Sequence, residues 1–131
     1  IYYILCGISA GLVQELSWYY ELQEVMRYDF VQLSSGLLSR DAFLGMLNTV
    51  GASGAVFGIL LASGVLFPNS YVLIGFAIPL KMKYFVFLYG AIELYMGIHN
   101  TWGQVAHFAH LGGMIGGAIL IYLWRKKGVI R

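Results

Sequence analysis

The sequence GASGAVFG at residues 51–58 places a serine, Ser53, among small side chains inside a long apolar segment. That segment, residues 43–67, contains no charged side chain. A second stretch, AHLGG at residues 109–113, places His110 inside another apolar segment farther along the chain. If the two segments pack side by side, a hydroxyl and an imidazole meet in the interior of a membrane.

The composition of the whole chain is typical of a membrane protein. Of its 131 residues, 60% are hydrophobic and 11% are charged, and the mean hydropathy is +0.75. Water-soluble domains carry about 25% charged residues, so that class is excluded. We expect one domain, residues 1–131, in a lipid bilayer. The only cysteine, Cys6, excludes a disulfide framework and is interpreted as a small buried hydrophobe.

Apolar segments along the chain predict an all-α fold, a polytopic transmembrane helical bundle. A membrane-spanning helix needs about 20 mainly apolar residues. We expect spans at about residues 1–20, 43–67, 84–98 and 105–124. Between the first two spans, apolar residues recur at roughly helical spacing, which predicts an interfacial helix within residues 15–42.

Local signals indicate how the second span begins and ends. Ser39-Arg40-Asp41 is typical of a helix cap before the span. Phe67-Pro68-Asn69-Ser70 is a turn signal after it.

The distribution of charge predicts the orientation of the spans. The loop at 67–83 and the tail after residue 124 together hold six basic residues and no acidic one, whereas residues 15–41 have a formal charge of −3. The positive-inside rule therefore places the loop and the C-terminal tail in the cytoplasm. The net charge of +2 is a topology signal, and it does not indicate nucleic-acid binding.

This orientation puts Ser53 and His110 near the same, outer side. With a rise of about 1.5 Å per residue, both lie at most about 15 Å below the outer surface. Glycines supply faces for close helix packing: Gly51, Gly54 and Gly58 in one span, and Gly113 and Gly117 in the other. His110 shares a helix face with Gly113 and Gly117, so its side chain projects where that face meets its partner.

A serine and a histidine at matched depth can perform acyl transfer. A serine hydroxyl becomes a good nucleophile when a base takes its proton, and histidine is the usual base near neutral pH. The oxyanion formed on the substrate carbonyl needs aimed donors. The backbone N–H of Ser53 is one candidate, because Gly51 and Gly54 let a substrate backbone approach.

These stretches resemble the two signature helices of the rhomboid intramembrane serine proteases. The resemblance is carried by GASGAVFG at 51–58 and AHFAHLGG at 106–113. The sequences IPLKMKY at 78–84 and IEL at 92–94 are also similar to the loop and helix that join those signatures in bacterial members. The similarity extends over essentially the whole chain.

The resemblance implies a Ser–His dyad with no acidic third member, in which Ser53 is the nucleophile and His110 the general base and acid. It implies that Phe57 packs against the imidazole of His110. Rhomboids have a core of six helices, and this chain is similar to the C-terminal four. The implied location is a bacterial inner membrane, with the active site on the periplasmic side.

One family motif, His-x-x-x-Asn, helps to hold the oxyanion and does not occur in this sequence. In the family it lies upstream of the segments seen here. We therefore interpret the chain as the C-terminal portion of a longer protein, and expect that donors to the oxyanion beyond the Ser53 N–H lie outside it.

Other polar residues in the spans have simpler interpretations. His99, His107 and His110 could suggest zinc, but no cysteine or carboxylate is spaced to join them, so we predict no metal and no cofactor. His107 is expected to line the cavity or bond nearby backbone. Glu93 is expected to be a partnered structural or gating residue rather than a catalytic acid.

Two function classes remain. The first is an intramembrane endopeptidase whose substrates are transmembrane segments of other membrane proteins. The second is an inert rhomboid-like protein that binds transmembrane helices. A small channel or transporter half would need polar faces through the bilayer, which the second and fourth spans lack below Ser53 and His110. The sequence indicates no oligomeric state.

Overall fold

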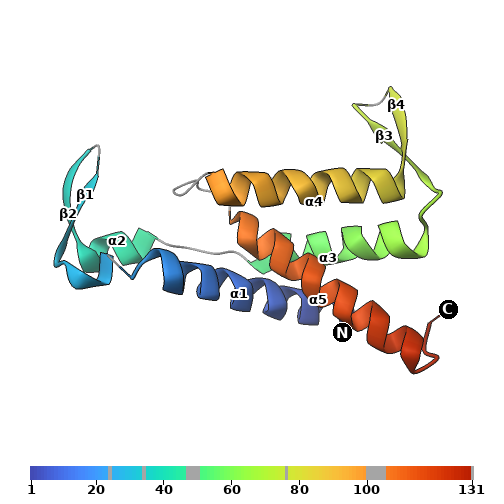
Figure 1. Ribbon diagram of the computed structural model, residues 1–131, viewed down its shortest axis with the longest axis horizontal. Helices are drawn as coiled ribbons and strands as arrows, with labels where there is room; N and C mark the ends of the chain where they lie inside the picture. Colours follow the sequence, from blue (N-terminus) through green and yellow to red (C-terminus); the bar gives the residue numbers. More distant parts are fainter. Residues whose placement is uncertain (24, 34, 47–50, 76, 100–105, 131) are drawn as a thin grey trace.

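The computed structural model describes residues 1–23, 25–33, 35–46, 51–75, 77–99 and 106–130, and these residues are mostly helical, as predicted. Figure 1 shows long helices side by side with a small hairpin at each end. The helices are α1 (Tyr2–Glu21), α2 (Arg40–Met46), α3 (Gly51–Leu66), α4 (Met82–His99) and α5 (His107–Lys126), with a short 3-10 helix at Val25–Arg27.

Helix α5 holds the bundle together, because it packs against α1, α3 and α4. The most deeply buried side chains of these helices are small: Cys6 and Ala10 of α1, Ala55 of α3 and Ala109 of α5. In lipid, where apolar side chains gain little by leaving the solvent, helices associate through such close backbone packing.

Hydrogen bonds join α1 to α3 and to α5. The Gln14 side-chain carbonyl accepts the backbone N–H of Ala109 at 3.1 Å, in the first turn of α5. The Ser9 hydroxyl donates to the carbonyl of Gly112 at 2.8 Å, and the Tyr2 hydroxyl donates to the carbonyl of Gly58 at 2.9 Å. The start of α5 is therefore held by α1 beside His110.

The outer surfaces of the helices are apolar. On α4, large side chains such as Phe87, Leu88 and Tyr95 are exposed. Exposed apolar surface on this scale is costly in water and suits contact with lipid. Within the described ranges, α5 is the one helix whose length and composition would carry it across a membrane, and α3 is apolar but shorter. The crossing of a membrane by the other predicted spans stays a prediction.

The predicted interfacial helix within residues 15–42 was wrong beyond the end of α1. There β1 (Phe30–Leu33) pairs antiparallel with β2 (Gly36–Ser39). Short apolar runs such as Leu37-Leu38 fit a strand as well as a helix, and Gly36 has a φ of 132°, a backbone conformation that L side chains rarely adopt.

The loop at 67–83 also contains strands, which the all-α prediction did not include. Strand β3 (Tyr71–Ile74) pairs antiparallel with β4 (Ile78–Lys81). Gly75 has a φ of 58°, in the left-handed region that glycine adopts readily. Figure 1 shows this hairpin at the opposite end of the bundle from β1 and β2, the end toward which α5 runs.

The predicted turn is confirmed, and Ser39 makes the contact of a helix cap. The Ser39 hydroxyl accepts the N–H of Ala42 at 3.4 Å, and the N–H of Ser70 donates to the carbonyl of Phe67 at 3.1 Å. The helix that Ser39 caps is α2, while Ser53 lies on α3, and residues 47–50 between them lie outside the described residues.

Candidate active site

The backbones of α3 and α5 approach closely where the two signature stretches cross. A Cβ atom on Gly54 would lie 2.8 Å from the carbonyl oxygen of Ala109. A Cβ atom on Gly113 would collide with the carbonyl oxygen of Gly54. Ser53 and His110 are the sequence neighbours of Gly54 and Ala109, so the crossing brings their helix turns together.

Close contacts between the glycines of α3 and α5 continue toward the C-terminal ends of both helices. A Cβ atom on Gly58 would lie 3.0 Å from the carbonyl oxygen of Gly113, and one on Gly117 would lie 3.3 Å from the Cα atom of Gly58. Gly51, the remaining glycine of the predicted packing set, is the first residue of α3. Glycine therefore sets the distance between α3 and α5 over about two helical turns.

The ring of Phe57 stacks on the ring of His110, with centroids 4.1 Å apart and planes at 8°. Ser53 lies four residues before Phe57 on α3, so the two side chains share one helix face about 6 Å apart along the axis. The Ser53 side chain is exposed, whereas His110 is buried. The structure thus combines an exposed serine residue with a buried histidine on facing helices.

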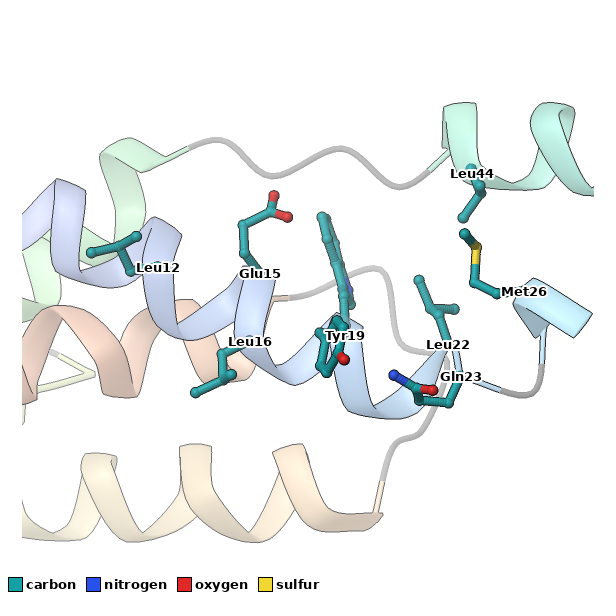
Figure 2. A pocket seen from close by; sticks show the side chains of 9 residues that line it. Leu12, Glu15, Leu16, Tyr19, Leu22, Gln23, Met26 and Leu44 are labelled. Carbon is teal, nitrogen blue, oxygen red and sulfur yellow. The ribbon is translucent and has the colours of Figure 1, made fainter.

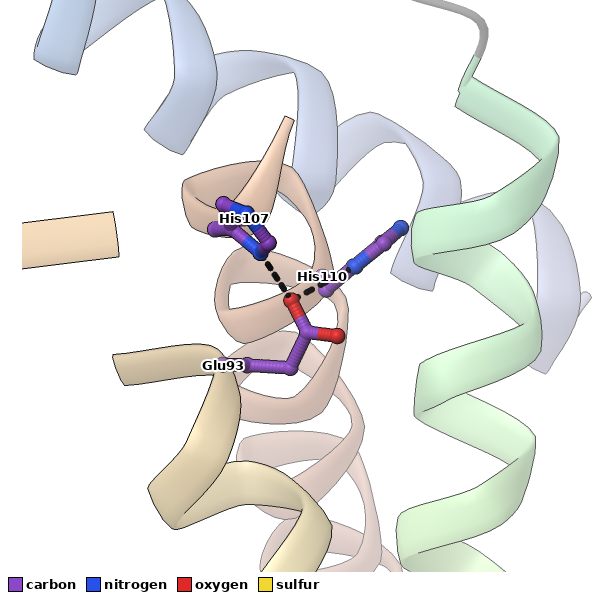
Figure 3. Close-up of side chains that lie close together, drawn as sticks. All are labelled: Glu93, His107 and His110. Atoms are coloured by element: carbon purple, nitrogen blue, oxygen red, sulfur yellow. Dashed lines mark hydrogen bonds and ion pairs between the residues drawn. The ribbon is translucent and has the colours of Figure 1, made fainter. Parts of the chain in front are cut away.

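Glu93 of α4 binds both histidines of α5. Its Oε2 atom lies 2.9 Å from Nδ1 of His110 and 2.7 Å from Nδ1 of His107. The three side chains are buried, with exposed fractions of 7–8%. Figure 3 shows the other ring nitrogen of His110 pointing away from Glu93, toward α3. We call these three residues the Glu93 cluster.

The prediction that no carboxylate is placed to join the histidines was wrong. Glu93 is 14 residues from His107 along the chain, and only the packing of α4 on α5 brings them together. One feature of the sequence indicated this contact. An acidic residue in an apolar helix needs hydrogen-bond donors, and the histidines of α5 can supply them. His99 is not in the cluster; it is exposed and its ring contacts Tyr95.

The Glu93 cluster also offers three metal-ligating atoms within 4.8 Å of one another. Both Nδ1 atoms and the Glu93 Oε2 atom are engaged in the two hydrogen bonds, at lengths ordinary for such bonds. Hydrogen bonding therefore accounts for the cluster, and the absence of a metal stays a prediction.

A separate open pocket of about 830 Å³ lies at the C-terminal end of α1 (Figure 2). It is bounded mainly by apolar side chains, including Leu12, Leu16 and Leu44. Its lining contains neither Ser53 nor any member of the Glu93 cluster, so the pocket does not coincide with the candidate chemistry.

Comparison with known proteins supplies one match. A family model described as the Rhomboid domain matches residues 1–127. Neither the curated proteins nor the solved structures gave a match to the chain.

Proposed function

Since this chain belongs to the rhomboid family, a family of membrane proteins and typically of serine proteases, we propose that it is an intramembrane serine endopeptidase. Its substrates are transmembrane segments of other proteins, cut near their outer ends. The observation that carries the proposal is the stacking of His110 on Phe57, one helical turn from the exposed residue Ser53. The glycine contacts of the α3–α5 crossing support the same pairing.

In the proposed reaction the Ser53 hydroxyl oxygen attacks the carbonyl carbon of the scissile peptide bond. His110 accepts the hydroxyl proton through the ring nitrogen that points away from Glu93. His110 then gives this proton to the leaving amine as the C–N bond breaks, which leaves an ester on Ser53. A water molecule, deprotonated by His110, hydrolyses the ester and restores the serine.

The negative charge on the carbonyl oxygen needs stabilisation at each tetrahedral stage. Ser53 lies in the first turn of α3, where backbone N–H groups point toward the helix end and the helix dipole is positive. The Ser53 N–H is therefore the donor that we assign within this chain.

We propose that the protein crosses a bacterial inner membrane several times, with its active site on the outer side and its C-terminus in the cytoplasm. The charges support this orientation. Lys81 ends β4 and Lys83 lies in the first turn of α4, while Arg125 and Lys126 end α5. The β3–β4 hairpin and the C-terminal end of α5 lie at the same end of the bundle (Figure 1). The starts of α3 and α5, with Ser53 and His110, lie toward the other end.

An inert rhomboid-like protein that binds transmembrane helices is the alternative, and product analysis separates the two. The chain is reconstituted in lipid vesicles with a single-span substrate that carries a tag at each end. We expect two fragments whose new termini, read by mass spectrometry, lie at the outer end of the span. Intact substrate that co-purifies with the chain would instead show a helix-binding protein.

A further inference from the structure

We propose that Glu93 is a positioning residue, which fixes the tautomer and orientation of His110 through the hydrogen bond to Nδ1. The proposal rests on the proposed function and adds an acidic partner that the rhomboid resemblance does not imply. The arrangement becomes Ser53, His110 and Glu93, contributed by α3, α5 and α4 in turn. His107 is the second hydrogen-bond partner of the same carboxylate oxygen.

The argument begins with the two hydrogen bonds at Glu93 Oε2. The proposal takes Glu93 as a carboxylate, which can only accept hydrogen bonds, so each nitrogen bonded to it carries the proton. Both Nδ1 atoms, at 2.7 Å and 2.9 Å from this oxygen, are therefore assigned as N–H donors. Neutral His110 then has its lone pair on Nε2.

This tautomer is the one that a general base for Ser53 requires. Nε2 points toward α3 in Figure 3, and α3 carries the phenyl ring that stacks on the imidazole. A proton taken from Ser53 would arrive on Nε2 and turn the ring into an imidazolium. The carboxylate on the opposite side of the ring would stabilise that cation, as buried acids do behind catalytic histidines.

His107 gives the carboxylate a fixed place. Without a second contact, the Glu93 side chain could rotate away from His110. The bond to His107, one turn earlier on the same helix, ties Oε2 to α5 at two points. We therefore expect His107 to act on the reaction only through Glu93, with a smaller effect than Glu93 itself.

Tautomers can be read directly from ¹⁵N NMR of histidine-labelled protein in detergent micelles. We expect both His107 and His110 to carry the proton on Nδ1 and a bare Nε2. The exposed His99 is identified by a His99→Gln variant. A wild-type spectrum with the proton on Nε2 of both cluster histidines would overturn the proposal, and this readout does not depend on catalysis.

Glu93→Gln supplies the kinetic test, because the amide keeps the shape but can donate a proton toward Nδ1. A wrong tautomer at a catalytic histidine costs up to about 10⁴-fold in rate. We expect kcat to fall by about 10²- to 10⁴-fold, with KM within about 3-fold, and Nε2 protonation to appear in the spectrum. Glu15→Gln removes an exposed carboxylate of α1 and should change neither quantity.

The outcomes separate this proposal from the proposed function. A wild-type chain that does not cleave contradicts the protease, while the spectrum still decides whether Glu93 sets the tautomer. Full kcat in Glu93→Gln, or a change confined to KM, contradicts the positioning role alone. Zinc found at one ion per wild-type chain and lost from Glu93→Gln would show the Nδ1 atoms to be metal ligands, which also overturns it.

Discussion

We expect cleavage to fall to the same residual level when alanine replaces Ser53, His110 or both residues together. Nucleophile and base act as one unit, so removing either costs about as much as removing both, of the order of 10⁶-fold in a soluble serine protease. We expect a loss of at least about 10⁴-fold for each variant. The measurement is fragment release from a single-span substrate in vesicles.

The matched control for Ser53 lies on the same helix. The Ser63 hydroxyl donates to the carbonyl of Ile59 at 3.0 Å, within its own turn of α3. Ser63→Ala therefore removes a hydroxyl from α3 without touching the α3–α5 crossing, and should cleave at the wild-type rate. Losses that multiply in the double variant would show that Ser53 and His110 act independently, against the mechanism.

Gly113→Ala is expected to lower cleavage by about 100-fold, although residue 113 carries no reacting group. The added methyl group would collide with the carbonyl of Gly54, so α3 and α5 must separate. Overpacking of this kind costs about 1–3 kcal/mol of stability. A displacement of about 1 Å between reacting groups can cost about 10²-fold in rate.

Gly11→Ala is the control for this prediction. A Cβ atom on Gly11 meets nothing within 4 Å, and alanine favours a helix over glycine by up to about 1 kcal/mol. Thermal unfolding and cleavage should therefore be unchanged or slightly improved. If Gly113→Ala cleaves as fast as Gly11→Ala, close packing at this crossing is not what aligns Ser53 with His110.

Sequence alone could predict the long helices, because each is a sustained apolar run with recognisable ends. The predicted range 1–20 overlaps α1, and 84–98 and 105–124 overlap α4 and α5. The hairpins were missed because strands of four residues are too short for periodicity to separate them from a helix. Their turns depend on backbone angles at Gly36 and Gly75, which residue identity suggests but does not determine.

The candidate site could also be predicted only where it depends on residues close together in the sequence. Short sequence motifs are enough to predict Ser53, His110 and the packing glycines. The sequence did not predict three hydrogen bonds to α5, two from its histidines to Glu93 and one from Ala109 to Gln14. Each joins residues on different helices, and a single sequence contains no record of which helices pack together.

The nucleophilic character of Ser53 can be measured most directly with a fluorophosphonate probe, followed by mass spectrometry of the labelled peptide. We expect one label, on Ser53, which is lost in both Ser53→Ala and His110→Ala and retained in Ser63→Ala. A label on another serine, or equal labelling of wild type and Ser53→Ala, would contradict a Ser53–His110 protease.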